Sequence, residues 1–320
     1  MRKKAFVAVL AGLLHFPAQM AMAQAGVLNS NQNPLQIGLL HWYVTNQTTQ
    51  FATGGYPSSM VFDGANLWVA TEANNTVTKL RASDGATLGS YAAGGSSPSA
   101  IAFDGANVWV ANGGNSLVTK LRASDGTNLG TFTVGNYPYA MAFDGTNIWV
   151  ANINGSTVSK LLASTGATVG TYAVPSPSAL AFDGTNIWAS NLYSGTVTKL
   201  LASTGAILGT FSVGQNPWGM AFDGTNIWVA LEGANQVAKV QPGTGVVLGS
   251  YSVGVSPIGV AFDGANIWVS NYSGNSVTKL LASNGANLGT FAVGNLPYAV
   301  AFDGASIWVA NTNSNTLSKL

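Results

Sequence analysis

The sequence has no cysteine and very few charged residues. Without cysteine, the chain can form neither a disulfide framework nor a zinc site with thiolate ligands. Charged residues make up 7% of its 320 positions, so it is neither a disordered polyelectrolyte nor a basic nucleic-acid-binding chain.

Long apolar runs are also missing, apart from a short one at the N-terminus. Met1–Lys4 is basic, Ala5–Phe16 is apolar, and Ala21–Ala23 fits an A-x-A cleavage site, with Ala23–Ala25 as the alternative. The pattern predicts a signal peptide over residues 1–23 and therefore a secreted or periplasmic protein. No other segment is long and apolar enough to span a membrane.

The mature chain is close to neutral. Three of the 12 basic residues lie in the signal segment, which leaves nine against 11 acidic residues. This balance offers no electrostatic attraction to nucleic acid or to an anionic membrane.

A repeat of about 40 residues dominates the rest of the chain. Its Phe-Asp-Gly anchor occurs seven times, at Phe62, Phe103, Phe143, Phe182, Phe222, Phe262 and Phe302. A period near 40 is typical of β-propellers and of helical arrays. Each copy is rich in Gly, Asn, Thr, Val and Trp and has no apolar stripe with a period of 3.6 residues, which excludes the helical array.

The third copy shows how one repeat folds. It contains tight turns at Asp144–Asn147 and Ser164–Gly166, where Asp, Asn and Gly suit left-handed backbone positions. The predicted strands cover residues 140–143, 148–151, 157–161 and 169–173. Four short antiparallel strands per repeat make one propeller blade. The predicted fold is therefore all-β, a seven-bladed β-propeller of four-stranded antiparallel blades.

The ends of the array indicate how the ring closes. The last copy stops at Leu320, after its third strand. Phe51 lies 11 residues before the first anchor, the same offset that separates Phe132 from Phe143 and Phe211 from Phe222. We therefore expect the segment around Phe51 to supply the fourth strand of the last blade, which removes two exposed sheet edges. The propeller then covers residues 48–320, and residues 24–47 form a linker or a plug on one face.

The repeats resemble known propeller families. Trp149–Asn152 and Trp268–Asn271 resemble the aromatic-Val-small-Asn core of YVTN-type repeats, and the whole 40-residue unit is similar to the repeats of virginiamycin B lyase and of NHL propellers. The resemblance covers residues 48–320 and implies a seven-bladed propeller. The literal Tyr43–Asn46 lies before the array, where no blade strand fits, and we interpret it as coincidence.

The resemblance to the lyase also implies a histidine-centred site on one face of the propeller. The only histidines here are His15, in the signal segment, and His41, before the first strand. No position of the array can take that role, so the sequence argues against lyase activity and predicts no catalytic residue.

Three residue types recur in every copy, and we interpret all three as structural. The Asp of the anchor accepts backbone hydrogen bonds in its turn. The Trp packs between blades. The Lys near the end of the third strand is a solvated residue. The lysines are Lys79, Lys120, Lys160, Lys199, Lys239, Lys279 and Lys319.

Two glutamates fall outside this scheme. Glu72 and Glu232 each lie four residues after the Trp of their copy. They belong to blades that are three apart, so we expect no close acid–base pair, although both can point into one cleft. The sequence predicts no metal site and no cofactor; a cation held in the central channel by carbonyl and Asn oxygens stays open.

The strongest functional signal is the unequal variation of the loops. In a blade of this type, the loops after the second and fourth strands emerge on one face, and the other two turns emerge on the opposite face. The opposite-face turns hardly change between copies, whereas the shared-face loops differ and collect aromatic residues. Loops on a rigid scaffold are where binding residues concentrate. The candidate ligand-binding residues are Tyr56, Tyr137, Tyr139, Tyr193, Trp218, Tyr272, Tyr298, Glu72 and Glu232.

These observations favour a monomeric binding scaffold that recognises a neutral polar ligand, a glycan or a peptide, on the variable face. Two alternatives stay open: a lyase, lactonase or hydrolase that uses Glu72 or Glu232 on the same face, and a surface-layer or adhesive structural protein.

Overall fold

The computed structural model describes residues 50–320, which form one unit of the chain. The predicted signal peptide (1–23), the linker (24–47) and the Tyr43–Asn46 motif lie outside the described residues. Within them the protein is almost entirely β-structure.

Seven four-stranded antiparallel sheets follow one another along the chain. Blades 1 to 3 contain β2 (Pro57–Phe62), β3 (Asn66–Thr71), β4 (Thr76–Arg81), β5 (Thr87–Ala92); β6 (Pro98–Phe103), β7 (Asn107–Asn112), β8 (Leu117–Arg122), β9 (Asn128–Thr133); and β10 (Pro138–Phe143), β11 (Asn147–Asn152), β12 (Thr157–Leu162), β13 (Thr168–Ala173). Blades 4 and 5 contain β14 (Pro177–Phe182), β15 (Asn186–Asn191), β16 (Thr196–Leu201), β17 (Ile207–Ser212); and β18 (Pro217–Phe222), β19 (Ile227–Leu231), β20 (Gln236–Val240), β21 (Val247–Ser252). Blades 6 and 7 contain β22 (Pro257–Phe262), β23 (Asn266–Asn271), β24 (Ser276–Leu281), β25 (Asn287–Ala292); and β26 (Pro297–Phe302), β27 (Ile307–Asn311), β28 (Thr316–Lys319), β1 (Gln50–Ala52).

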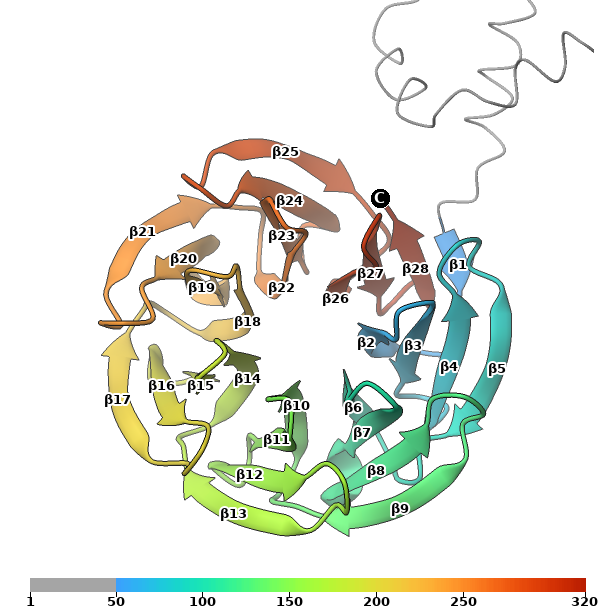
Figure 1. Cartoon of the computed structure of the whole chain (residues 1–320). Helices are drawn as coiled ribbons and strands as arrows, with labels where there is room; N and C mark the ends of the chain where they lie inside the picture. Colours follow the sequence, from blue (N-terminus) through green and yellow to red (C-terminus); the bar gives the residue numbers. More distant parts are fainter. Residues whose placement is uncertain (1–49) are drawn as a thin grey trace, which may run out of the picture. The chain divides into compact units, whose positions relative to one another are not determined.

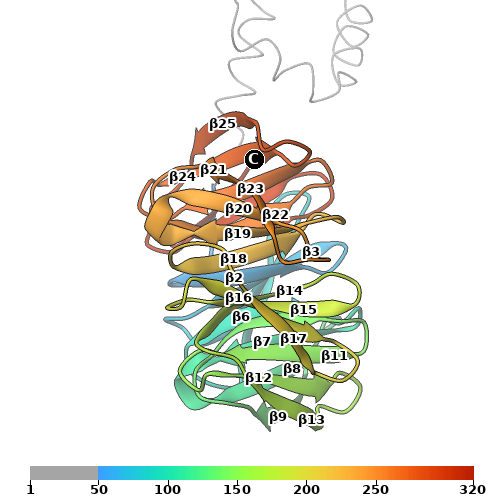
Figure 2. The same ribbon diagram turned by 90° about the vertical axis from the view of Figure 1, so that its left-hand side faces the viewer.

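The sheets stand around a central axis, with the first strand of each repeat innermost and the fourth outermost (Figure 1). Figure 2 shows the ring edge-on, with turns and loops on either side. The only helices in residues 50–320 are two single 3₁₀ turns, η1 (Gly113–Asn115) and η2 (Glu232–Ala234). Neither is long and apolar enough to cross a membrane.

Ring closure by the N-terminal strand is confirmed. β1 pairs antiparallel with β28, in the register Phe51 opposite Leu317, so the two ends of the described chain share one sheet (Figure 1). The Phe51 ring lies 5.1 Å from the ring of Trp308. On its other side it packs on Gly85 of blade 1, where a Cβ atom would collide with it. One aromatic side chain therefore completes the last blade and joins it to the first.

The repeated aspartate fixes the first turn of each blade, as predicted. In blade 3, Asp144 Oδ1 accepts the backbone N–H groups of Thr146 and Asn147 (2.9 and 2.6 Å). Its Oδ2 accepts the indole N–H of Trp149 at 2.7 Å. Gly145, which has φ 94°, supplies the left-handed residue of the turn. The carboxylate therefore links the turn to the blade core.

The repeated tryptophan packs between blades, as predicted. Trp149 is fully buried and belongs to a cluster that includes Leu180, Ile187 and Leu200 of blade 4. Its ring also stacks on Tyr172, in the outer strand of its own blade, at 5.6 Å. Each blade junction within the described ring is thus an apolar layer centred on one indole.

The prediction for the repeated lysine is wrong. Lys160 is only 3% exposed. Its Nζ donates to the carbonyl of Ala202 in the next blade at 2.6 Å and lies 5.0 Å from the Trp149 ring centroid. The same bond to a neighbouring blade forms at Lys79, Lys120, Lys199, Lys239 and Lys319. The sequence could not show this, because the accepting carbonyl lies about 40 residues away.

The aspartates of these turns are expected to make the protein less stable at acid pH. Burial alone would raise the pKa of the Asp144 carboxyl, but the hydrogen bonds from Trp149 and Asn147 outweigh it and hold the pKa below the usual value. The same holds at Asp63, Asp104, Asp183 and Asp263. A carboxyl whose pKa is lower in the folded state contributes stability above the pKa of the unfolded chain, about 4, and loses it as pH falls further.

We therefore expect the urea midpoint to change little between pH 7 and pH 5 and to fall steeply below about pH 4. Urea titrations at a series of pH values measure this. Asp144→Asn should lower the midpoint at pH 7 and weaken the acid dependence. A midpoint that stays constant down to pH 2.5 would contradict this account of the turns.

Candidate functional site

The two faces of the ring are built differently. The turns between the first and second strands and between the third and fourth strands form one face, which we call the uniform face. The loops after the second and fourth strands form the other, which we call the variable face. The predicted division of the loops is the one that the antiparallel order of every blade requires.

The variable face has one backbone conformation in all seven blades. The residue before the first proline of each blade is left-handed, with φ between 41° and 56°. Its carbonyl accepts the N–H of the residue that follows the second strand, at 2.8 to 3.1 Å. These seven residues are Tyr56, Ser97, Tyr137, Ser176, Asn216, Ser256 and Leu296.

This arrangement changes how the loop variation is interpreted. A positive φ is costly for residues as large as Tyr and Leu, and such strain concentrates at functional sites. The backbone is held in the same way at this position around the ring, so the variation there lies in the side chains, which are Tyr, Ser, Asn or Leu. The loop after the fourth strand also varies in length, from three residues between β13 and β14 to five between β5 and β6. The variable face is a rigid template that presents side chains of several types.

The inner strands surround a cavity of about 260 Å³ on the ring axis. Sequence reasoning placed Tyr139, Trp218 and Tyr298 in loops. They are instead the second residues of β10, β18 and β26, and these strands line the cavity. In blade 1 the same position is Ser58, whose hydroxyl donates to Pro98 of the next blade at 2.7 Å. At this position, the serine of blade 1 forms a hydrogen bond to the next blade, whereas the aromatic residues of blades 3, 5 and 7 extend into the cavity.

These aromatic side chains meet although their blades are far apart in sequence. The hydroxyl groups of Tyr139 and Tyr298 are hydrogen-bonded to each other. Trp218 lies 5.7 Å from Tyr139, Tyr137 stacks on Tyr139 at 6.1 Å, and Tyr272 meets Tyr298 edge-on at 6.0 Å. We call these five residues, which come from blades 3, 5, 6 and 7, the axial aromatic cluster.

The phenols of Tyr139 and Tyr298 are neutral at physiological pH. Burial raises the pKa of Tyr139 to about 12, although the hydrogen bond with Tyr298 acts in the opposite direction. Burial also raises the pKa of Tyr298 well above its usual value. Both hydroxyl groups are therefore uncharged, and the cluster presents aromatic faces with polar edges.

The other predicted aromatic residues lie apart from this cluster. Tyr56 is 49% exposed and Tyr193 is 80% exposed. Within residues 50–320, neither makes a ring contact with the cluster. The nine candidates thus divide into an axial group of five aromatic residues, two peripheral tyrosines and two glutamates.

The two glutamates do not form a pair. Glu72 directly follows β3, so it lies in a loop of the variable face, and its side chain is exposed. Glu232 begins η2, and its Oε2 accepts a hydrogen bond from the amide of Asn216 at 3.2 Å. In the described part of the chain, no hydrogen bond joins the two carboxylates, and no group of three or more His, Asp or Glu could hold a metal ion.

One feature of this face was missed by sequence reasoning. The Asn at the end of the second strand is fully buried in blades 2, 3, 4, 6 and 7. In blade 4, the Asn191 amide donates to the hydroxyls of Thr196 and Thr198, each at 2.8 Å. The sequence did contain a signal for this residue, because the Asn ends a repeated segment of Trp, two small or branched residues and Asn. The Asn side chain holds the end of the second strand, where the loop of the variable face begins, to the third strand of the same blade.

No protein-family model and no curated protein sequence matches this chain. The solved structures that resemble it include hydrazine synthase from Kuenenia stuttgartiensis, with 18% identity, a TM-score of 0.74 and coverage of 86% of this chain and 98% of that one. A catalytically inactive histidine-to-alanine variant of virginiamycin B lyase from Staphylococcus aureus, determined with quinupristin, has 18% identity, a TM-score of 0.72 and coverage of 86% and 96%.

A streptogramin B lyase has 17% identity, a TM-score of 0.71 and coverage of 84% of this chain and 93% of that one. The likeness to the lyases expected from the repeats is therefore confirmed for the fold. At this level of identity it shows the fold alone. Membership of the YVTN or NHL families is not supported by any family model.

Proposed function

We propose that this protein is a secreted or periplasmic binding module that recognises a neutral polar ligand, a glycan or a peptide, at the axial aromatic cluster of its variable face. The observation that carries this proposal is the convergence of five aromatic rings from four blades at one end of the ring axis.

The chemistry of the cluster favours such a ligand. Aromatic rings present broad apolar faces at a small cost in side-chain entropy, and their hydroxyl and indole groups form hydrogen bonds at the edges. Four of the seven template positions are Ser or Asn, which suit hydroxyl and amide groups of a ligand. The mature chain is nearly neutral, so it exerts no strong electrostatic attraction on a charged ligand, and a neutral ligand fits it better.

Catalysis is not part of the proposal. The inactive lyase variant among the similar structures lacks one histidine, and the propeller of this protein contains none. Glu232 is hydrogen-bonded to Asn216 and lies in a different blade from Glu72. The array therefore offers no acid–base pair of the usual kind.

A glycan and peptide array probed with the full chain identifies the ligand, and substitution of the cluster tests the site. We expect Tyr139→Ala with Trp218→Ala to weaken binding by at least about 30-fold, or about 2 kcal/mol, because two stacking surfaces are lost. Isothermal titration calorimetry measures the affinity, and thermal denaturation checks that the variant is folded.

Tyr193→Ala is the matched control, since it removes an exposed tyrosine from the same face but outside the cluster. We expect it to change the affinity less than about threefold. Equal affinity in the double variant and the unchanged protein would overturn the site assignment. Turnover of a bound compound that Glu232→Gln abolishes would instead favour an enzyme.

A further inference from the structure

Among blades 1 to 6, the uniform face departs from its repeat in blade 5. In blades 1, 2, 3, 4 and 6 an alanine follows the third strand and donates its N–H to the carbonyl of the Asp-Gly turn; in blade 4 this bond joins Ala202 to Thr185 at 3.1 Å. Blade 5 has Pro242 at this position, and proline has no N–H to donate. The carbonyl of Thr225 therefore lacks the bond that its counterparts in blades 1, 2, 3, 4 and 6 receive.

The second and third strands of blade 5, β19 and β20, have five residues each where those of blade 4 have six. In blade 4, the pairing of the second and third strands extends to Asn186 opposite Leu201. In blade 5 it stops one pair earlier, at Ile227 opposite Val240. The Asp-Gly turn and the Gln241–Gly243 turn are thus no longer held together by the backbone.

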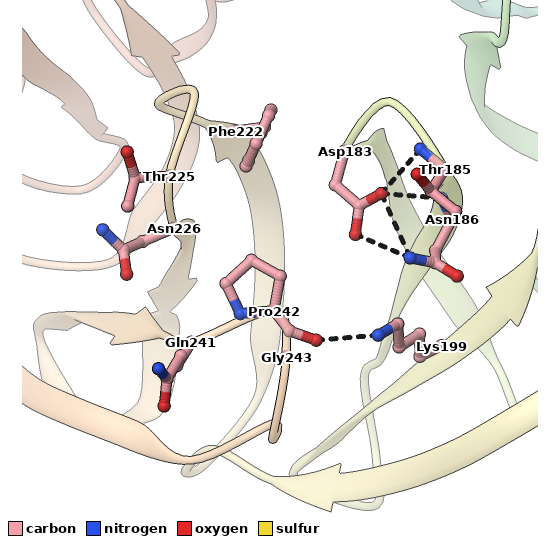
Figure 3. Close-up of a pocket in the computed structure, with 10 residues that line it drawn as sticks. All are labelled: Asp183, Thr185, Asn186, Lys199, Phe222, Thr225, Asn226, Gln241, Pro242 and Gly243. Atoms are coloured by element: carbon pink, nitrogen blue, oxygen red, sulfur yellow. Dashed lines mark hydrogen bonds between the residues drawn. The ribbon is translucent and has the colours of Figure 1, made fainter.

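A cleft of about 390 Å³ lies here, at the junction of blades 4 and 5. Figure 3 shows Asn226 and Gln241 on one side of Pro242, and Asp183 and Lys199 on the other. The aromatic ring of Phe222 forms part of the wall. The cleft is lined by the turns of the uniform face, on the opposite side of the ring from the loops of the variable face.

Asn226 is the unusual polar group of this cleft. Its counterparts Asn66, Asn107, Asn147, Asn186 and Asn266 donate their side-chain amides to the aspartate of their own turn. Asn226 is only 7% exposed, yet in residues 50–320 its side-chain amide makes no such bond to Asp223. Asn226 is not among the fully buried side-chain amides that lack a partner, so its amide is accessible from the cleft and free to bind a ligand.

The charged groups of the cleft are already satisfied by the protein. Lys199 Nζ donates to the carbonyl of Pro242 at 2.8 Å and lies 5.3 Å from the Trp188 ring centroid. Asp183 accepts the indole N–H of Trp188 at 2.8 Å and the amide of Asn186. Gln241 Oε1 already accepts a hydrogen bond from the Thr244 hydroxyl at 2.9 Å. The groups left for a ligand are the Asn226 amide, the NH₂ group of Gln241, the Thr225 hydroxyl and the Phe222 ring.

We propose that this cleft binds one sugar residue of a neutral saccharide. Amide and hydroxyl groups form hydrogen bonds with the hydroxyls of a sugar, and the ring of Phe222 packs against its C–H face. A small concave site with a few convergent polar groups and one apolar wall is typical of a small-molecule site. The site is separate from the axial aromatic cluster and does not depend on the function proposed for it.

Saturation-transfer NMR of the full chain with D-glucose, D-galactose, D-mannose and N-acetyl-D-glucosamine tests the proposal. We expect saturable binding of at least one of these sugars. Asn226→Ala should weaken it at least tenfold, because the free amide is lost. Pro242→Ala should weaken it similarly, because alanine restores the N–H donor that five other blades have, and so closes the cleft. Both variants should fold, since neither removes a hydrogen bond made in the protein.

Asn147→Ala is the matched control. It changes the equivalent position of blade 3, where the amide bonds to Asp144, so we expect lower stability and unchanged sugar binding. The Tyr139→Ala, Trp218→Ala variant should also bind the sugar normally, which separates this site from the axial cluster. Absence of binding for all four sugars, or binding that survives both Asn226→Ala and Pro242→Ala, would overturn the proposal.

Discussion

Trp149→Ala is expected to lower the free energy of unfolding by about 4 kcal/mol, the middle of the range for a buried aromatic residue. The indole is fully buried between blades 3 and 4. Its loss opens a cavity, removes the N–H bonded to Asp144 at 2.7 Å and leaves Lys160 Nζ without the ring beneath it. Urea denaturation followed by fluorescence of the remaining tryptophans measures the change.

Two further variants separate the contributions. Trp149→Phe keeps most of the packing and loses the hydrogen bond, so we expect a loss of about 1–2 kcal/mol. Trp218→Ala removes a partly exposed indole from the variable face and should cost much less than Trp149→Ala. A similar loss for Trp218→Ala and Trp149→Ala would show that the repeated tryptophan is not the centre of the blade junction.

Removal of β1 is expected to destabilise the whole ring. The strand pairs with β28, fills the space between Trp308 and Gly85 with the Phe51 ring, and is followed by Thr53, whose N–H donates to Asn315 at 3.0 Å. A chain that begins at Gly54 loses all three contributions. We expect a loss of at least about 3 kcal/mol, which corresponds to a melting temperature lower by about 6–12 °C.

The same truncation exposes the unpaired edge of β28, which is a template for association with a second chain. Thermal denaturation and size-exclusion chromatography measure the two effects. A chain that begins at Thr48 keeps β1 and is the matched control for the loss of the preceding residues. Equal melting temperatures and monomeric elution of both chains would show that the ring does not depend on the N-terminal strand for closure.

Much of the fold could be predicted because each blade repeats the same local chemistry. The Asp-Gly turns determine where the first two strands meet, and the 11-residue offset of Phe51 identified the closing strand. The strands of blade 3 agree with the predicted ones to within about two residues at each end. Turn residues and hydrophobic runs act over a few positions, so they can be read from the sequence.

The candidate site could be predicted only in part. Loop variation identified the face and the aromatic residues on it. It did not show that Tyr139 and Tyr298, 159 residues apart, meet at the axis, or that Tyr56 and Tyr193 stay apart from them. It also placed Tyr139, Trp218 and Tyr298 in loops, because the break in pairing after the proline of each first strand has no clear sequence signal.

The buried lysines and the cleft beside Pro242 could not be predicted from the sequence either, because both depend on contacts that form only in the folded ring. Whether Lys160 is solvated depends on the Ala202 carbonyl of the next blade. Whether the Asn226 amide bonds to Asp223 depends on the orientation of its side chain in the folded turn (Figure 3). The sequence by itself determined the number of blades, the order of their strands and the turns, since these follow from interactions within one repeat. Only the tertiary structure decided which side chains meet across the axis and between blades, because closing the ring brings together residues that no local interaction relates.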